Sequence, residues 1–245
     1  MSRNDIYLSC IFMGRAEFIK EIFEDQYMKD NDINTIIKIL KKELDVGTMP
    51  IVSHLAQNQR DPFVILISTL LSLRTKDEVT AVATDRLFEL ASTPEEMLKV
   101  PVDKIAKTIF PVGFYRVKAK NIHHTCRELI KRFDSKVPDD IDTLLTIKGV
   151  GRKTANLVVS LAYGKDAICV DTHVHRISNR LGYVKTKTPD ETEFALRKKL
   201  PRRHWIIYNT IMVAFGRKTC KPVSPLCSQC PVNEYCDQIG VTLSR

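Results

Sequence analysis

Apolar residues recur at intervals of three and four positions along most of this chain, which is the spacing of one buried face of an α-helix. Turn signals such as Thr93-Pro94 and Pro111-Val112-Gly113 separate the periodic segments. The best strand candidate, Ala167–Val170, is only four residues long. The pattern therefore predicts an all-α fold of roughly ten or eleven helices. One helix is expected to begin near Ile36. The others are expected at Phe63–Leu73, Glu78–Leu90, Glu95–Lys99, Val102–Ile109, Val117–Phe133, 138–145, Thr154–Ala162, Asp171–Arg180, Glu191–Leu200 and Trp205–Phe215.

The composition is that of a globular protein that can bury a core. The 245 residues suffice for one large domain or two small ones, and 44% of them are hydrophobic while 27% are charged. The longest apolar stretch, Phe63–Leu71, is too short to span a bilayer. These observations exclude a mainly disordered chain and predict that no segment crosses a membrane.

Positive charge is in excess and favours a polyanionic partner. Lys and Arg number 38 against 29 Asp and Glu, which gives a formal net charge of +9. Such an excess favours nucleic acid first and an anionic membrane surface second. Because solvated lysines alone also make a protein basic, the charge by itself does not select nucleic acid.

The cysteine count and the N-terminus predict a reducing compartment. Seven cysteines, an odd number, do not suit a secreted disulfide framework. The first residues, Met1–Asp5, lack the basic and apolar regions of a secretory signal. We therefore expect a cytoplasmic protein in which Cys10, Cys126 and Cys169 are small buried residues.

Four of the cysteines lie close together near the C-terminus in the pattern Cys-x6-Cys-x2-Cys-x5-Cys. They are Cys220, Cys227, Cys230 and Cys236. A tetrahedral zinc site usually uses two close pairs, whereas only the middle pair is close here. Four thiolates on one loop-rich segment fit a [4Fe–4S] cluster. The spacing alone does not separate iron–sulfur firmly from zinc, but it indicates a metal centre.

A second motif joins two short helices through Gly149-Val150-Gly151. Glycine accepts a positive φ and leaves no side chain between the backbone and a ligand. The next helix begins at once beside Arg152 and Lys153, so its free N–H groups face outward near positive charge. Such a helix terminus suits a phosphate oxygen. The alternative is a tight helix–helix turn, but on a basic chain we expect this hairpin to bind the DNA backbone.

The third motif is Val170–Arg176, which places Asp171 at the start of a helix. A carboxylate in that position is most often an N-cap that satisfies free N–H groups. His173 and His175 are separated by one residue and form only a weak metal motif. A lysine nucleophile, however, needs an acid–base group nearby, and Asp171 is the best-placed candidate.

Together these motifs resemble the helix–hairpin–helix DNA glycosylase superfamily, and specifically its endonuclease III branch. The resemblance includes Leu70–Asp77 and Gly113–Ala119 and extends from about Ile36 to Cys236. It implies a two-domain all-α fold. A six-helix barrel domain would cover residues 55–165, with the helix–hairpin–helix at about 140–162. A helical iron–sulfur domain would combine residues 35–54 with 166–245, and the order of the leader, residues 1–34, is left open.

The resemblance implies one active site for two reactions. Lys153 would attack C1′ of an extruded nucleotide and displace the base, and Asp171 would stabilise the cationic sugar and assist proton transfer. Desolvation and neighbouring positive charge, including Arg152, would keep the lysine amine neutral. β-Elimination would then cleave the abasic strand. The implied substrate is duplex DNA with an oxidised pyrimidine of the thymine glycol type or an abasic site.

The same resemblance implies the DNA contacts and the cofactor. Gly149 and Gly151 would hold a backbone phosphate together with a monovalent cation, and the four cysteines would ligate a [4Fe–4S] cluster. Arg74 and Phe114 stand where relatives often carry Gln and Leu, which leaves the lesion and opposite-base preference open. The residues expected to contact DNA are Ser72, Arg74, Phe114, Lys148, Gly149, Gly151, Arg152, Thr154, His173 and Lys221. We expect a monomer associated with the nucleoid.

Other functions compete with this one. The nearest is an adenine- or mismatch-specific glycosylase of the same superfamily, but the adenine branch needs a carboxylate near Ser68 and Phe63–Lys76 contains no acid. A non-catalytic hairpin module that binds DNA would explain the charge and the glycines but not Lys153 together with Asp171. A ferredoxin-like electron carrier would explain only the cysteines.

Overall fold

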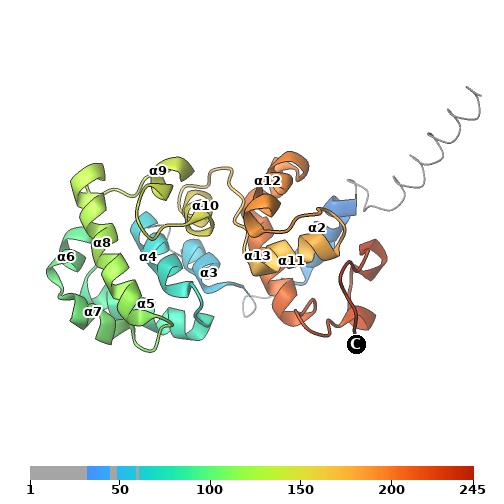
Figure 1. Cartoon of the computed structure of the whole chain (residues 1–245), viewed down its shortest axis with the longest axis horizontal. Helices are drawn as coiled ribbons and strands as arrows, with labels where there is room; N and C mark the ends of the chain where they lie inside the picture. The colour runs from blue at the N-terminus through green and yellow to red at the C-terminus, as the bar shows by residue number, and fades with distance from the viewer. Residues whose placement is uncertain (1–31, 45–48, 59–60) are drawn as a thin grey trace, which may run out of the picture.

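The computed structural model describes residues 32–44, 49–58 and 61–245, and within these ranges all regular structure is helical (Figure 1). The all-α prediction is confirmed. The α-helices are α2 (Asp32–Lys42), α3 (Ile51–Asn58), α4 (Pro62–Ser72), α5 (Asp77–Leu90), α6 (Pro94–Lys99), α7 (Val102–Ile109), α8 (Tyr115–Phe133), α9 (Ile141–Leu145), α10 (Arg152–Leu161), α11 (Thr172–Arg180), α12 (Pro189–Lys199) and α13 (Trp205–Lys218). Short 3₁₀ helices are η2 (Arg202–His204), η3 (Cys227–Gln229) and η4 (Asn233–Tyr235). The predicted leader lies outside the described residues except for 32–34, which begin α2.

Among the helices in the described ranges, one α-helix was not predicted. The helix α3 has only eight residues, and its buried side chains, Val52, Ser53 and Ala56, form one narrow face that includes a hydroxyl. So short a face does not repeat often enough to establish a helical period.

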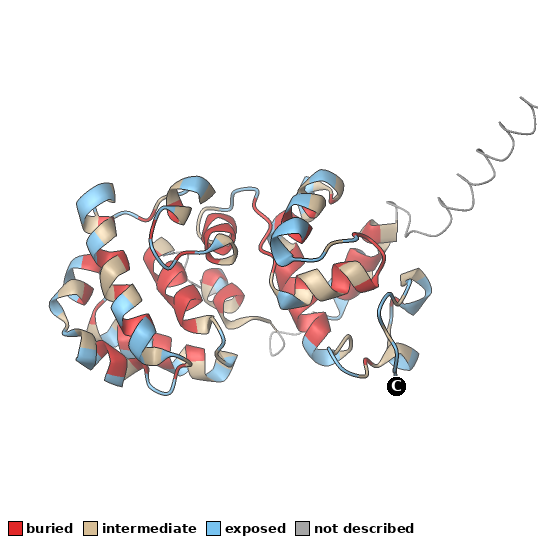
Figure 2. Ribbon diagram, in the orientation of Figure 1, coloured by how far each residue is buried: buried red, intermediate tan, exposed pale blue. Residues whose placement is uncertain are grey.

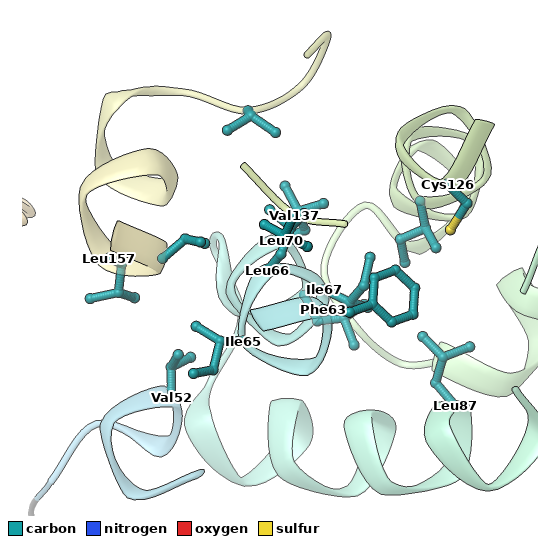
Figure 3. Close-up of a cluster of buried hydrophobic side chains, with 14 of the residues drawn as sticks. Val52, Phe63, Ile65, Leu66, Ile67, Leu70, Leu87, Cys126, Val137 and Leu157 are labelled. Carbon is teal, nitrogen blue, oxygen red and sulfur yellow. The ribbon is translucent and has the colours of Figure 1, made fainter. Parts of the chain in front are cut away.

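The first hydrophobic core surrounds α4, whose residues 63–71 are all buried (Figures 2 and 3). Asp61 is the N-cap of this helix, because its carboxylate accepts hydrogen bonds from the N–H groups of Phe63 at 2.7 Å and Val64 at 3.1 Å. The helices α3, α5, α8 and α10 pack around α4, and α6 and α7 pack against α8. The apolar stretch is thus a central helix of a folded core.

The second hydrophobic core is formed by α2, α11, α12 and α13 together with part of the cysteine segment. Ile36 and Leu40 of α2 belong to this core with Tyr208 and Ile211 of α13, so the first described helix packs with helices near the C-terminus. In Figure 1 these helices lie to one side of the molecule and the helices of the first core to the other.

An extended segment, residues 167–170, joins the two cores. Ala167 and Cys169 belong to the first core, whereas Ile168 and Val170 belong to the second. Successive side chains of an extended segment point in opposite directions. The short apolar run at 167–170 therefore arises because this segment lies between two apolar clusters, and it is not a β-strand.

The predicted domain boundary at residue 54 falls inside α3, and it stays a prediction. Val52 belongs to the first core, because α3 packs against α4 and α5. The same helix also contacts the second core, where the buried hydroxyls of Ser53 and Thr210 are 2.9 Å apart. The other predicted boundaries stay a prediction. None of the helices in the described ranges combines the length and the apolar character needed to cross a bilayer.

Candidate active site

The glycine hairpin joins α9 to α10 and leaves the start of α10 uncovered. Gly149 adopts a φ of +94°, in the region that favours glycine. Gly151 is the N-cap of α10 and has an extended φ of −96°, so the predicted positive φ holds for Gly149 alone. A Cβ on Gly151 would meet no atom within 4 Å. Lys148 and Gly149 are exposed, so a ligand can approach this turn from solvent.

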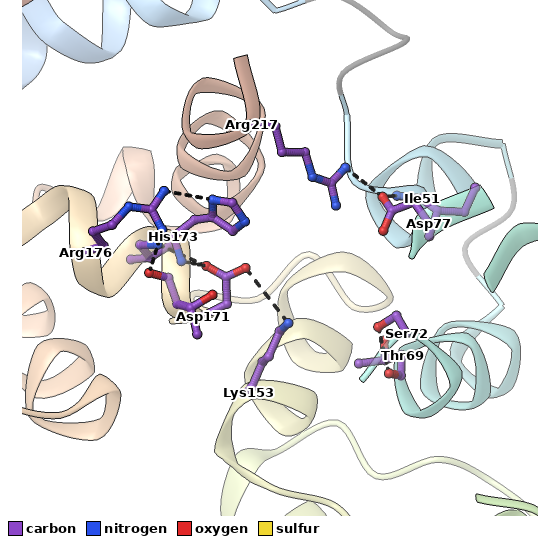
Figure 4. A network of polar contacts seen from close by, with 11 residues as sticks. Ile51, Thr69, Ser72, Asp77, Lys153, Asp171, His173, Arg176 and Arg217 are labelled. Carbon is purple, nitrogen blue, oxygen red and sulfur yellow. Dashed lines mark hydrogen bonds and ion pairs between the residues drawn. The ribbon is translucent and has the colours of Figure 1, made fainter. Parts of the chain in front are cut away.

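Lys153 lies in the first turn of α10 and faces Asp171 from the segment before α11 (Figure 4). Its Nζ atom is 3.9 Å from Oδ2 of Asp171, and the two side chains are 37% and 11% exposed. The amine is therefore accessible to a substrate while it stays next to a largely buried carboxylate. The two residues proposed from separate motifs lie together.

The two oxygen atoms of the Asp171 carboxylate make different contacts. Oδ1 accepts hydrogen bonds from the N–H groups of His173 at 2.9 Å and Val174 at 3.0 Å, and so caps α11. Oδ2 is left to face Lys153. The interpretation as a helix cap and the interpretation as a functional acid are thus compatible, because each uses a different oxygen.

Two clefts meet at this pair. The first, which we call the outer cleft, has a volume of about 750 Å³ and is lined by Arg74, Phe114 and Gly151. The second, the inner cleft, has a volume of about 180 Å³ and is lined by Ser72 and Asn209 among others. Lys153, Asp171 and Thr172 line both clefts. A substrate group held in either cleft would lie beside the amine.

Arg152 is held in an ion pair in this structure, and its predicted contact with DNA stays a prediction. Its guanidinium donates two hydrogen bonds to the carboxylate of Glu193, at 2.8 and 2.5 Å. Its Cζ atom lies 4.7 Å from the centre of the Phe194 ring. Glu193 is 2% exposed and also bonds to Arg197 at 3.0 Å. The positive charge of Arg152 is therefore compensated, and in this structure it neither faces solvent as a free phosphate ligand nor adds an unpaired cation beside Lys153.

Arg74 and Phe114 lie side by side and both line the outer cleft. The Arg74 guanidinium is 5.7 Å from the centre of the Phe114 ring, and the phenylalanine is 61% exposed. Both residues have positive φ values, +53° and +57°, which non-glycine residues rarely adopt. A large exposed aromatic side chain held in a strained backbone is typical of a functional site. Their contact with DNA stays a prediction.

Lys118 supports this loop and was missed as a site residue. Its ammonium is buried and donates to the carbonyl groups of Leu71 and Leu73 and to the hydroxyl of Thr75. The two carbonyl groups lie at the end of α4, where acceptors lack intrahelical partners and the helix dipole favours a cation. Burial lowers the pKa of Lys118 to about 8. Lys118 thus holds the loop that carries Arg74.

Three other residues that are predicted to contact DNA are buried or half-buried. Thr154 is 1% exposed, so its side chain packs inside the protein and only its backbone remains a candidate. Ser72 donates to the carbonyl of Thr69 at 2.8 Å and lines the inner cleft. His173 also lines the inner cleft, and its Nδ1 lies 3.2 Å from Nη2 of Arg176. Burial lowers the pKa of His173, which favours the neutral ring.

A chain of contacts connects the start of α11 with the cysteine segment. Arg176 contacts His173 and donates to the carbonyl of Cys220 at 2.8 Å. These side chains pack against Gly216 of α13, where a Cβ would lie 2.4 Å from Nδ1 of His173. Only glycine permits this close approach. The helix that Asp171 caps is therefore packed directly against the residues that precede the first clustered cysteine.

The four clustered cysteines surround one cavity. Cys220, Cys227, Cys230 and Cys236 all line it, and all are half-buried and free of disulfide bonds. Among the residues that the structure describes, no three side chains of the metal-ligating types converge on a single-ion site. Nη1 of Arg180 lies 3.6 Å from Sγ of Cys220 and supplies positive charge beside this thiol. The donor set therefore fits an anionic iron–sulfur cluster held by four thiolates.

Two smaller predictions stay untested. Lys221 lies in the segment between the first two clustered cysteines, and its carbonyl accepts from Nη1 of Arg180 at 2.6 Å. Its contact with DNA and the monovalent cation at the glycine hairpin remain predictions.

Comparisons with known proteins agree with this geometry. Residues 67–202 match the model of the HhH-GPD superfamily base excision DNA repair protein, and residues 220–236 match the iron–sulfur binding domain of endonuclease III. The second match confirms the predicted [4Fe–4S] cluster. Endonuclease III of Thermotoga maritima is 48% identical over 189 residues, which cover 76% of this chain and 89% of that protein.

Two further proteins extend the comparison. Endonuclease III of Bacillus subtilis is 40% identical over 177 residues, which cover 72% of this chain and 81% of that protein. A solved structure of a non-covalent endonuclease III–DNA complex is 38% identical with a TM-score of 0.76, and the match covers 85% of this chain and 95% of that one. The chain therefore belongs to the HhH-GPD superfamily of base excision DNA repair proteins and, within it, to the endonuclease III family.

Proposed function

We propose that Lys153 and Asp171 carry out the reaction of this protein, which is a DNA glycosylase and abasic-site lyase of base excision repair. The protein binds DNA. Its proposed substrate is duplex DNA that contains an oxidised pyrimidine of the thymine glycol type or an abasic site. We further propose that it acts as a monomer in the cytoplasm, on the nucleoid.

One observation carries this proposal. The amine of Lys153 lies 3.9 Å from Oδ2 of Asp171, it is accessible, and it lies where the outer and inner clefts meet. A binding module that only held phosphates would need the glycine turn but not an accessible amine beside a buried carboxylate.

The proposed chemistry follows from this placement. The amine of Lys153 attacks C1′, so that a C1′–N bond to the enzyme forms while the glycosidic bond breaks, and the departing base takes up the proton that the amine loses. The carboxylate of Asp171 offsets the positive charge that develops on the sugar and assists this proton transfer. The sugar ring then opens as the C1′–O4′ bond breaks and O4′ takes up a proton, which leaves a C1′=N Schiff base with Lys153. Loss of a C2′ proton from this Schiff base breaks the C3′–O bond and expels the 3′ phosphate, and hydrolysis of the C=N bond releases Lys153.

The cysteine segment supports this site without joining the reaction. The cluster bound by the four cysteines would fix the segment that contacts Arg176 and Arg180 of α11. Because Asp171 caps the same helix, the cluster is expected to contribute to its position. The positive net charge of the protein as a whole would attract the DNA backbone.

Borohydride trapping on a duplex with thymine glycol tests the proposal. We expect a covalent protein–DNA adduct in the wild type and none in Lys153→Gln. The matched control is Lys165→Gln, which removes a lysine that forms a surface ion pair with Asp139 beyond the far end of α10. This control should still form the adduct. Strand cleavage by Lys153→Gln at the wild-type rate would reject the proposal.

A further inference from the structure

Asn209 is a buried polar residue of α13 that the reaction above does not use. It is 5% exposed, and it lines the inner cleft together with Lys153, Asp171 and Ser72. It does not line the outer cleft, where the glycine hairpin and Phe114 lie. Asn209 is therefore placed to contact a group that enters the inner cleft, and not one held in the outer cleft.

The amide of Asn209 has an unmet hydrogen-bond requirement. Its Nδ2 atom is buried and has no hydrogen-bond partner among the described residues. Leaving a buried donor unpaired costs free energy comparable to a lost hydrogen bond, so buried amides are nearly always paired. An unpaired amide that borders a cleft next to a reactive amine is explained if a ligand completes its bonding.

The surrounding contacts hold Asn209 in place. The next residue, Thr210, bonds to Ser53 of α3 at 2.9 Å. Two turns further along the same helix, Arg217 bonds to Asp77 at 2.8 Å (Figure 4). These two bonds join α13 to α3 and α5, and Ser53, Asp77 and Arg217 line the inner cleft together with Asn209.

We propose that the carboxamide of Asn209 binds the hydrogen-bonding edge of the extruded pyrimidine in the inner cleft, and that it is a specificity-determining residue. This inference rests on the proposed function. A carboxamide presents a donor and an acceptor side by side. An oxidised thymine presents the complementary pair, a ring N–H next to a carbonyl oxygen. The cleft has a volume of about 180 Å³, which leaves room for one small ring.

The positions of the two clefts decide which part of the nucleotide meets Asn209. The outer cleft contains Gly151 at the uncovered start of α10, which suits the sugar–phosphate backbone. Lys153 and Asp171 line both clefts, so the sugar carbon that reacts belongs at their junction. The base attached to that carbon then extends into the inner cleft, toward Asn209.

An abasic site separates this role from a structural one, because it lacks the base that Asn209 would bind. Asn209→Leu removes both hydrogen-bonding groups at nearly constant size, and Asn209→Ala removes them without added bulk. Under single-turnover conditions we expect base release from a thymine glycol duplex to fall by about 10- to 100-fold in both variants. Strand cleavage at a preformed abasic site should stay within about twofold of wild type, which also shows that the variants are folded.

The matched control is Thr210→Val, which removes the neighbouring bond to Ser53. A structural perturbation of α13 should change both activities by the same factor, and we expect this pattern for the control. Equal losses on both substrates in the two Asn209 variants, or no loss on either, would overturn the inference. Failure of the wild type to cleave a preformed abasic site would instead overturn the proposed function, and the inference with it.

Discussion

Glu193 is the residue whose replacement tests the electrostatics of the hairpin most directly. Its carboxylate is 2% exposed and bonds to both Arg152 and Arg197, whose side chains are each 25% exposed. In Glu193→Gln the side chain keeps its shape and one carbonyl acceptor. The negative charge is lost, however, and two guanidinium groups remain without their counter-ion.

The size of the effect follows from the burial of each partner. Removing one side of a fully buried ion pair costs about 3–5 kcal/mol, whereas exposed pairs contribute about 0–1 kcal/mol. Because the carboxylate is buried while both arginines reach solvent, we expect the free energy of unfolding to fall by about 2–3 kcal/mol. Urea denaturation of the cluster-containing protein measures this change. The control Asp139→Asn removes a half-exposed pair with Lys165 and should cost less than about 0.5 kcal/mol.

The same variant should bind DNA more tightly, although its free energy of unfolding is lower. Once Glu193 is neutral, Arg152 can pair with a phosphate beside the hairpin, so binding at low salt becomes tighter. The slope of log affinity against log salt concentration should steepen by about 0.9 for one added phosphate contact. Fluorescence anisotropy with an uncleavable abasic analogue measures this slope. An unchanged slope together with unchanged stability would refute the reasoning, because it would mean that Glu193 does not hold Arg152 in solution.

Three further predictions concern the loop, the hairpin and the cluster. Burial lowers the pKa of Lys118 to about 8 from 10.5, so between these pH values the folded protein binds fewer protons than the unfolded chain. The free energy of unfolding, measured by chemical denaturation, should therefore rise with pH in this range. The rise should be weaker in Lys118→Met. Gly149→Ala should lose about 1–2 kcal/mol of stability by chemical denaturation, because alanine is strained at a φ of +94°. Cys230→Ser should purify with less iron by elemental analysis and with lower thermal stability, because one cluster ligand is replaced.

The helices could be predicted because their physical basis is local. Apolar spacing, N-caps and turn residues act over a few positions, so α7 has the predicted bounds and α4 differs by one residue at each end. The four clustered cysteines are also close in sequence, and their spacing carries the signal by itself. The helix α3 was missed because its stability depends on packing against α4 and α5 more than on its own period.

The departures at the site come from contacts between distant residues. Glu193, which neutralises Arg152, is 41 positions away from it. Lys118 reaches carbonyl groups 45 and 47 positions away, and its sequence neighbours give no sign that its ammonium is buried. The pairing of Lys153 with Asp171 was expected from the family resemblance and from the need for an acid near the amine. Periodicity alone would not have brought them together.

The Asp171 carboxylate caps α11 with one oxygen and faces Lys153 with the other, so the fold and the proposed chemistry depend on one side chain. Evolution cannot tune the acid freely, since any residue unable to accept the two N–H groups would loosen the first turn of α11. Asparagine has nearly the same shape as aspartate and is as good an N-cap, but it carries no charge. Comparing asparagine with alanine at this position therefore distinguishes loss of catalytic charge from unravelling of a helix end, two defects that would look alike in a simple activity screen.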